Sequence, residues 1–221
     1  MKNKKMHKEG WSTIIVAVAL LVIAVVFLFI YDTPLWLKVI VLTPLVIGTA
    51  IVINFFRYPY RTFRGDELHD VIAPSDGRIV TIEEVFEPDY FQDKRIQISI
   101  FMSVTNVHAQ WCPLNGQVLK VAHEDGRFKK AYLPKSSHEN ERSTIVIKSD
   151  AGPVIMMRQV AGAMARRIVT YINAGDKSEI NGELGFIKFG SRIDIFLPLD
   201  SEILVKMGER VKGNVTSVAK I

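Results

Sequence analysis

The chain has 221 residues, of which 48% are hydrophobic, and its mean hydropathy is +0.18. It can hold one compact domain plus a segment more apolar than a soluble core. Its single cysteine, Cys112, excludes an internal disulfide and agrees with a reducing compartment. The formal net charge of +5 favours an anionic partner, either a lipid surface or a nucleic acid.

The most apolar sequence lies near the N-terminus. Residues 14–31 carry no charge, and the only charge in residues 35–56 is Lys38. Each run is long enough to cross roughly 30 Å of hydrocarbon as a helix, and residues 32–34 suffice for a tight turn. We therefore predict a transmembrane helical hairpin over residues 13–56. A secretory signal is the alternative, but the apolar run is too long and no small-residue cleavage site follows it.

Cations flank both ends of this hairpin. The basic residues on the two sides are Lys2, Lys4, Lys5 and Lys8 before it and Arg57, Arg61 and Arg64 after it. Because positive charge marks the cytoplasmic side, we expect residues 1–12 to be a cytoplasmic N-terminus. Residues 57–221 would then lie on the cytoplasmic face of the cell (inner or plasma) membrane. With two spans present, we expect anionic membrane lipids as partners and no nucleic acid, and the three arginines would raise the local concentration of those lipids.

Beyond residue 64, short β-branched runs alternate with Gly, Pro and Asp. This pattern predicts a mainly β domain, built like a sandwich or barrel. The candidate strands are residues 78–82, 96–101, 117–122, 144–148, 154–160 and 167–172, and two more around Ser191. Residues 161–167 could instead form a short helix. A weak repeat of turn-then-strand units resembles biotinyl and lipoyl carrier folds, so a membrane-anchored carrier or adaptor module is an alternative function.

The tripeptide Phe189-Gly190-Ser191 lies between two of these predicted strands. A Gly-Ser pair alone is typical of a turn. A serine held by sheet on both sides can also attack the carbonyl before it, and Gly190 has no Cβ to block that attack. Removal of the Ser191 α-proton would then break the chain and leave a dehydroalanine that hydrolyses to a pyruvoyl group. Both interpretations fit the tripeptide.

Two further residues could act with Ser191. Asp76 lies in a Pro-Ser-Asp-Gly turn and His108 in a loop, and together the three could form a base-activated nucleophile with an orienting carboxylate. The same set would suit a serine hydrolase that does not cut itself, although no Gly-x-Ser-x-Gly motif surrounds Ser191. Arg166 and Arg167 are ordinary surface charges or a fork for phosphate or carboxylate. The histidines show no ligand spacing with Cys112, so we expect no metal.

Several motifs follow one another in a fixed order. They are Arg57 with its preceding aromatics, then residues 74–77, 101–108, 140–142, 161–168 and 189–192. This series resembles the short form of phosphatidylserine decarboxylase over about residues 57–221. The N-terminal hairpin is also similar to that form.

The resemblance implies a proenzyme that cuts itself between Gly190 and Ser191 into a large subunit, 1–190, and a small subunit, 191–221. Ser191 would become a covalent pyruvoyl group, with no metal and no pyridoxal phosphate. That group would form a Schiff base with phosphatidylserine and release phosphatidylethanolamine. The cleaved protomers could form a homo-oligomer.

The resemblance also assigns roles to two side chains. Asp76 and His108 match the aspartate and histidine that the family uses in self-cleavage. The longer form has a second histidine three positions after the first, and here that position is Trp111. The division of work between histidines is therefore open, and His108 is the candidate for both steps.

Overall fold

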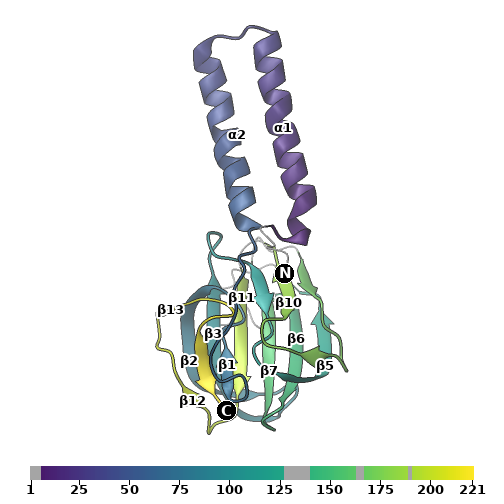
Figure 1. The fold of residues 1–221 in the computed structure, drawn as a ribbon, viewed down its shortest axis with the longest axis vertical. Coiled ribbons are helices and arrows are strands. Elements are labelled where there is room, and N and C mark those ends of the chain that lie inside the picture. The colour runs from purple at the N-terminus through teal and green to yellow at the C-terminus, as the bar shows by residue number, and fades with distance from the viewer. Residues whose placement is uncertain (1–5, 127–139, 163–166, 189–190) are drawn as a thin grey trace. The chain divides into compact units, whose positions relative to one another are not determined.

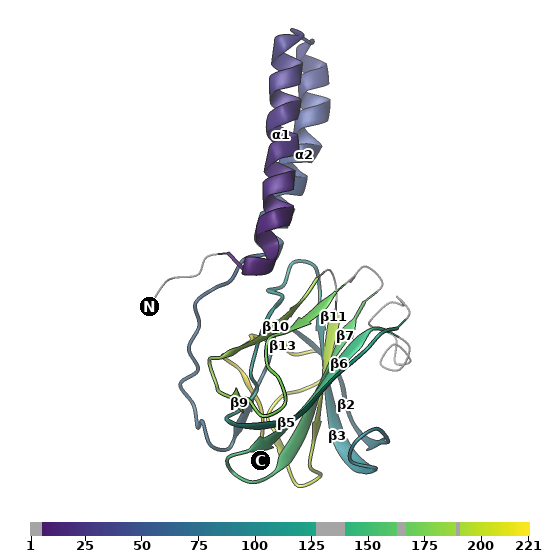
Figure 2. The same ribbon diagram turned by 90° about the vertical axis from the view of Figure 1, so that its right-hand side faces the viewer.

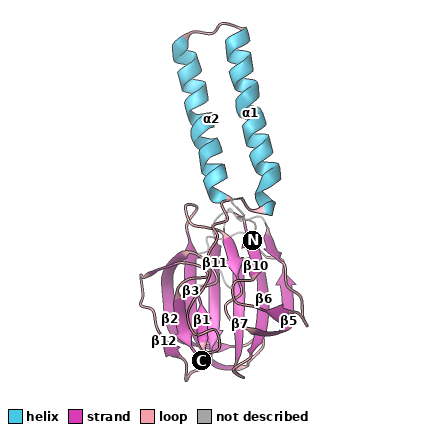
Figure 3. Cartoon of the chain, viewed as in Figure 1, coloured by secondary structure: helices cyan, strands magenta, loops and turns pink. Residues whose placement is uncertain are grey.

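A computed structural model describes residues 6–126, 140–162, 167–188 and 191–221 of the chain (Figure 1). It divides into two compact units, Met1–Tyr60 and Arg61–Ile221. The first is helical and the second is built from strands, as the colouring by secondary structure shows (Figure 3). The prediction of a mainly β domain preceded by two apolar helices is therefore confirmed.

The N-terminal unit is a pair of helices, α1 (Trp11–Ile30) and α2 (Leu35–Phe55), after a short 3-10 turn, η1 (Lys8–Gly10). Both are apolar on every side, which is typical of helices surrounded by lipid. The segments Lys8–Ile30 and Leu35–Phe55 are long and apolar enough to cross a membrane. The turn between them places Asp32 at a φ of +43°, a conformation that aspartate tolerates better than most residues.

The second unit contains three antiparallel sheets among the described residues. The large sheet has the order β13 (Arg210–Val211), β2 (Gly77–Glu87), β3 (Asp93–Met102), β11 (Ser191–Leu197), β7 (Val154–Ala161), β6 (Arg142–Ser149), β5 (Gly116–Glu124) and β9 (Lys177–Ser178). The two smaller sheets are β1 (Asp70–Ile72), β14 (Ser217–Lys220) and β12 (Glu202–Ile203), and β4 (Ala109–Trp111), β10 (Glu183–Ile187) and β8 (Ile168–Thr170). The large sheet curls, which brings its inner face around the core (Figure 2).

Strict alternation along the central strands fixes which side chains enter the core. In β11, Ile193, Ile195 and Leu197 join the main apolar cluster, and Ile98 and Ile100 join it from β3. The residues between them point to the opposite face, because successive side chains of a strand alternate. Five of the predicted strands lie inside β2, β3, β5, β6 and β7, whereas the run at 167–172 forms only the short strand β8. Most of the alternative helix at 161–167 falls outside the described residues.

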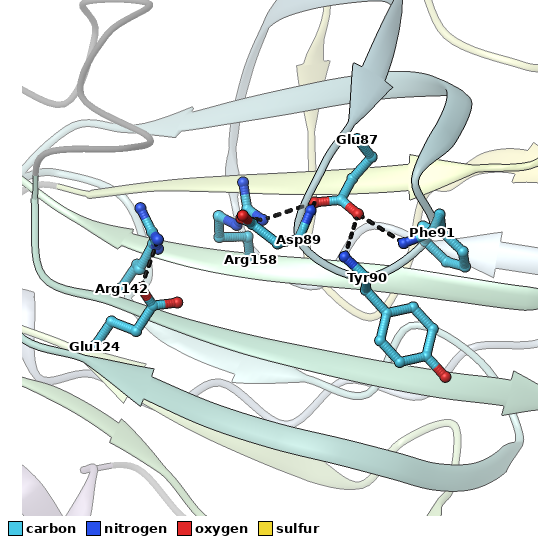
Figure 4. Close-up of polar contacts among 7 residues, drawn as sticks. All are labelled: Glu87, Asp89, Tyr90, Phe91, Glu124, Arg142 and Arg158. Atoms are coloured by element: carbon cyan, nitrogen blue, oxygen red, sulfur yellow. Dashed lines mark hydrogen bonds and ion pairs between the residues drawn. The ribbon is translucent and has the colours of Figure 1, made fainter.

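The outer face of the large sheet holds buried ion pairs. The Arg158 guanidinium lies 3.2 Å from a Glu87 oxygen and 2.8 Å from an Asp89 oxygen, and Figure 4 shows this cluster together with the pair of Arg142 and Glu124. The Arg158 and Glu87 side chains are only 2% and 1% exposed. Ionised groups this far from water need close partners, because a buried charge without them is strongly destabilising.

The turn after β2 supplies further partners for Glu87. Its carboxylate accepts hydrogen bonds from the backbone N–H groups of Asp89, Tyr90 and Phe91 at 3.0, 2.8 and 2.9 Å (Figure 4). Burial by itself raises the pKa of Glu87, but these three N–H groups and Arg158 outweigh it and lower the pKa below the ordinary 4.5. The carboxylate therefore stays charged in the folded protein.

Candidate active site

Ser191 is the first residue of the central strand β11. It lies opposite Met102 of β3 and Ala161 of β7, so sheet holds it on both sides. The residue is fully buried, and its hydroxyl donates a long hydrogen bond of 3.7 Å to the Met102 sulfur. The hydroxyl thus lies in a dry, apolar setting. Phe189 and Gly190, the other residues of the predicted cleavage motif, lie outside the described residues.

His108 is buried directly before β4. Its Nδ1 lies 3.1 Å from the backbone oxygen of Asn106. Because a carbonyl oxygen can only accept, Nδ1 carries the proton and Nε2 is the nitrogen able to take one. The next residue, Ala109, pairs with Phe186 of β10, and only residues 188–190 separate the end of β10 from Ser191. The topology therefore brings His108 to the end of β10 that leads to the predicted cleavage bond.

Asp76 binds an arginine that the sequence had suggested for another role. Both Arg61 Nη groups donate to its carboxylate, with Nη2–Oδ2 at 3.0 Å, and the Gly213 N–H donates to Oδ1 at 2.9 Å. Arg61 is thus a partner of Asp76 rather than a free cation beside the helices. No local sequence pattern indicates the contact between Asp76 and Gly213, because the two residues lie far apart along the chain.

Trp111 covers this ion pair. The Arg61 guanidinium carbon lies 5.5 Å from the centre of the indole, close enough for a cation–π contact. A Cβ at Gly213 would come within 2.8 Å of the same ring, so only glycine fits there. The longer form of the decarboxylase that the sequence resembles would have its second histidine at position 111. In this chain the Trp111 indole lies there, against Arg61, the partner of Asp76.

Residues 140–142 support the strand beside Ser191. The Asn140 side chain donates to the backbone oxygen of Ala161 at 2.7 Å, and the Ala161 N–H donates to the backbone oxygen of Glu141 at 2.9 Å. Both Asn140 and Glu141 are buried. These contacts make Asn140 and Glu141 a brace for Ala161, the residue opposite Ser191.

The predicted arginine fork is only partly described. Arg166 lies outside the described residues. Arg167 is exposed, and its backbone oxygen accepts a hydrogen bond from the Lys188 N–H at 3.2 Å. This contact lies close to the predicted cleavage bond, and the role of Arg167 in substrate binding stays a prediction.

A cavity of about 460 Å³ opens beside Asp76. Its lining residues are Asp76, Gly77, Arg78, Phe101, Ser103, Thr105, Asn106, Arg210, Val211 and Lys212. Asn106 belongs to this lining and also holds His108 through its backbone oxygen. The cavity thus connects Asp76 with the loop that fixes His108.

Two other features bear on cofactor chemistry. Within the described residues, no group of three or more His, Cys, Asp or Glu side chains is placed to hold a metal ion. Burial raises the pKa of the Cys112 thiol, so it stays a neutral core side chain rather than a nucleophile.

A buried serine, a histidine and an aspartate are the residue types that an enzyme with a base-activated side-chain nucleophile uses. Comparison with known proteins supports this class. The family model described as phosphatidylserine decarboxylase matches residues 49–219. The chain belongs to the phosphatidylserine decarboxylase family, whose members are enzymes.

Relatives match the chain over almost its whole length. A phosphatidylserine decarboxylase proenzyme of Phocaeicola vulgatus is 48% identical over 222 residues, covering 100% of this chain and 97% of that protein. Proteins of the same name from Bacteroides fragilis and Porphyromonas gingivalis are 48% and 45% identical, covering 100% and 98% of this chain and 97% and 99% of those proteins.

Proposed function

We propose that this chain makes its own pyruvoyl group from Ser191 and uses it to convert phosphatidylserine to phosphatidylethanolamine. The observation that carries the proposal is the position of Ser191, fully buried at the first residue of a central strand and held by β3 and β7. The hydroxyl and the carbonyl that it would attack belong to adjoining residues of one chain, so the attack is intramolecular and loses little entropy.

The cleavage proceeds in steps that balance. The Ser191 hydroxyl attacks the Gly190 carbonyl and passes its proton to a base. The C–N bond then breaks, the base returns the proton to the Ser191 nitrogen, and the amide becomes an ester. Loss of the Ser191 α-proton then eliminates the Gly190 carboxylate, which ends the large subunit, 1–190. The dehydroalanine at residue 191 takes up water and releases ammonia, which leaves the small subunit, 191–221, with a carbonyl at its start. His108 is the proposed base, because its Nε2 is the nitrogen able to accept a proton.

The site fits a small uncharged acyl group. Met102 and Ala161 flank residue 191 on the two neighbouring strands, and both are buried and apolar. When bound, a pyruvoyl group supplies an electron sink for the carbanion left by loss of carbon dioxide. The chain's own residues exclude water around it and, through His108, deliver the proton that replaces the carboxylate.

The two apolar helices suit a lipid substrate. We place both ends of the hairpin, residues 13–56, on the cytoplasmic side, because cations flank it there. Residues 57–221 would then work at the cytoplasmic surface of the membrane. Phosphatidylserine would not need to leave the bilayer in order to reach the enzyme.

An intact-mass measurement of the purified protein tests the proposal. We expect two polypeptides, residues 1–190 and residues 191–221, the second with a blocked, carbonyl-bearing N-terminus. Borohydride added with phosphatidylserine should attach the lipid amine to the smaller piece. One continuous chain in active protein, or labelling of Ser191 by a fluorophosphonate probe, would instead identify an uncleaved serine hydrolase.

The role of His108 is tested by its replacement. We expect His108→Ala to slow cleavage by about 10²-fold or more, because general acid–base catalysis contributes about that much. The fraction of cut chain is followed by denaturing gel during expression and after purification. His69→Ala is the matched control, since His69 is half exposed and pairs with Asp66 instead. Normal maturation and turnover in His108→Ala would contradict the role given to it.

A further inference from the structure

The cavity beside Asp76 carries a surplus of positive charge. Arg78, Arg210 and Lys212 line it and are exposed, whereas its lining carboxylate, Asp76, is already bound by Arg61. Within the described parts of the chain, the side chains of Arg210 and Lys212 make no hydrogen bond or ion pair. The lining of this cavity therefore contains exposed cations and no carboxylate free to neutralise them.

Two of these cations are forced together by the sheet. Arg210 of β13 and Arg78 of β2 are direct cross-strand partners. Like charges placed directly opposite each other destabilise a sheet. The Arg78 Nη1 donates to the backbone oxygen of Gly208 at 3.0 Å, which holds its guanidinium beside β13. A bound anion would remove the repulsion between these arginines.

The register of the sheet relates this cavity to the reactive residue. Arg78 pairs with Phe101, which places Gly77 beside Met102, and Met102 in turn pairs with Ser191. The backbones of Gly77 and Ser191 are therefore two strand spacings apart, roughly 9.6 Å, at the same end of the sheet. Because Ile79 and Val211 enter the core, Arg78 and Arg210 point to the outer face, whereas the Ser191 side chain points inward with Met102. In a phosphoserine headgroup, four bonds separate the amine nitrogen from the phosphorus, about 5 Å when extended. A phosphate held by these cations would therefore lie over the end of the sheet, with the amine reaching toward the backbone of residue 191.

We propose that Arg78, Arg210 and Lys212 bind the phosphodiester of the lipid substrate and so direct its serine amine toward residue 191. This inference rests on the decarboxylation proposed above. Planar guanidinium groups suit phosphate oxygens, and an ammonium adds a third charge to the same site. The hydroxyl groups of Ser103 and Thr105 lie in the same lining and offer polar contacts to the headgroup.

Binding is measured on the full chain in detergent, in the uncut Ser191→Ala background, with glycerophosphoserine as the probe. We expect Arg210→Gln to weaken binding about tenfold, which corresponds to loss of one charge-assisted contact. Lys148→Gln is the matched control, because it removes one exposed positive charge from β6, far from this cavity's lining. Arg210→Lys should retain more affinity than Arg210→Gln, which tests charge in a variant with a side chain of similar length.

Two further ligands test whether the site recognises the lipid headgroup or free phosphate. Free serine should bind Arg210→Gln and the parent chain alike. Inorganic phosphate should bind more weakly than glycerophosphoserine, since it lacks the headgroup. Equal affinity of the parent chain and Arg210→Gln for glycerophosphoserine would overturn the proposal. Inorganic phosphate binding as tightly as the diester would also overturn it, since the site would then be one for free phosphate.

In cleavage-competent protein, Arg210→Gln should mature fully and raise KM for phosphatidylserine while kcat changes little. A fall in kcat with unchanged KM would contradict a binding role. The binding assay does not depend on cleavage or decarboxylation, so a failure of the proposed function leaves its result intact and the two failures can be told apart.

Discussion

Ser191→Ala is expected to yield a single uncut chain with no decarboxylase activity. Alanine has no hydroxyl to attack the preceding carbonyl, and no leaving group forms on its Cβ. The substitution removes one oxygen from a fully buried side chain whose contact with the Met102 sulfur is long, so the fold should survive. Intact mass and release of carbon dioxide from phosphatidylserine measure the two effects separately.

Two other variants sharpen this result. Ser191→Cys should still cleave, more slowly, because it keeps a nucleophile on Cβ at the same place. Ser201→Ala is the control, since it deletes a serine hydroxyl from the turn after β11 and should mature normally. Recovery of normal activity in uncut Ser191→Ala would refute the pyruvoyl assignment.

Arg158→Met is expected to cost about 3–5 kcal/mol of folding free energy, because it leaves the buried Glu87 carboxylate without its cationic partner. For a domain of this size that corresponds to a fall in Tm of about 6–20 °C. Methionine keeps most of the volume beside Phe196, so lost packing contributes little. Thermal unfolding in the Ser191→Ala background measures the effect on one continuous chain. Arg64→Met, at an exposed position, should change Tm far less.

The difference in Tm between the parent and Arg158→Met should depend on pH in a definite direction. The folded-state pKa of Glu87 lies below its ordinary 4.5, so the stability it contributes is present above that value and is lost as pH falls through the folded pKa. The gap in Tm between the parent and Arg158→Met should therefore be wide at neutral pH and narrow below about pH 4.5. A gap independent of pH would show that packing, not charge, explains the loss.

Local patterns in the sequence predict much of the fold. Two long apolar runs predict α1 and α2, and alternating β-branched runs predict the long strands, because burial of one sheet face imposes a period of two. The short strands escape such reasoning. β13 has only two residues, Arg210 and Val211, and one is charged, so nothing in its composition indicates that it pairs with β2.

In the candidate site, too, some features could be predicted from local sequence and others could not. Ser191 between two strands follows from its flanking apolar runs. The partners of Asp76 do not follow from its flanking sequence, because Arg61 and Gly213 lie near opposite ends of the domain's sequence. Contacts made across a fold depend on how sheets close on each other, and a single sequence carries no local signal for them. The burial of Asn140 against Ala161 was missed for the same reason.

The position of residue 191 at the head of β11 has a consequence for the molecule that the proposed cleavage would produce. The short piece would keep its place in the middle of the large sheet through backbone ladders to β3 and β7, while β14 pairs with β1 and β13 with β2. The end that the proposed cleavage would create is thus clamped at the point where the bond would break. Neither piece could then diffuse away without dismantling the other, so cleavage would change the chemistry of residue 191 and leave the fold intact.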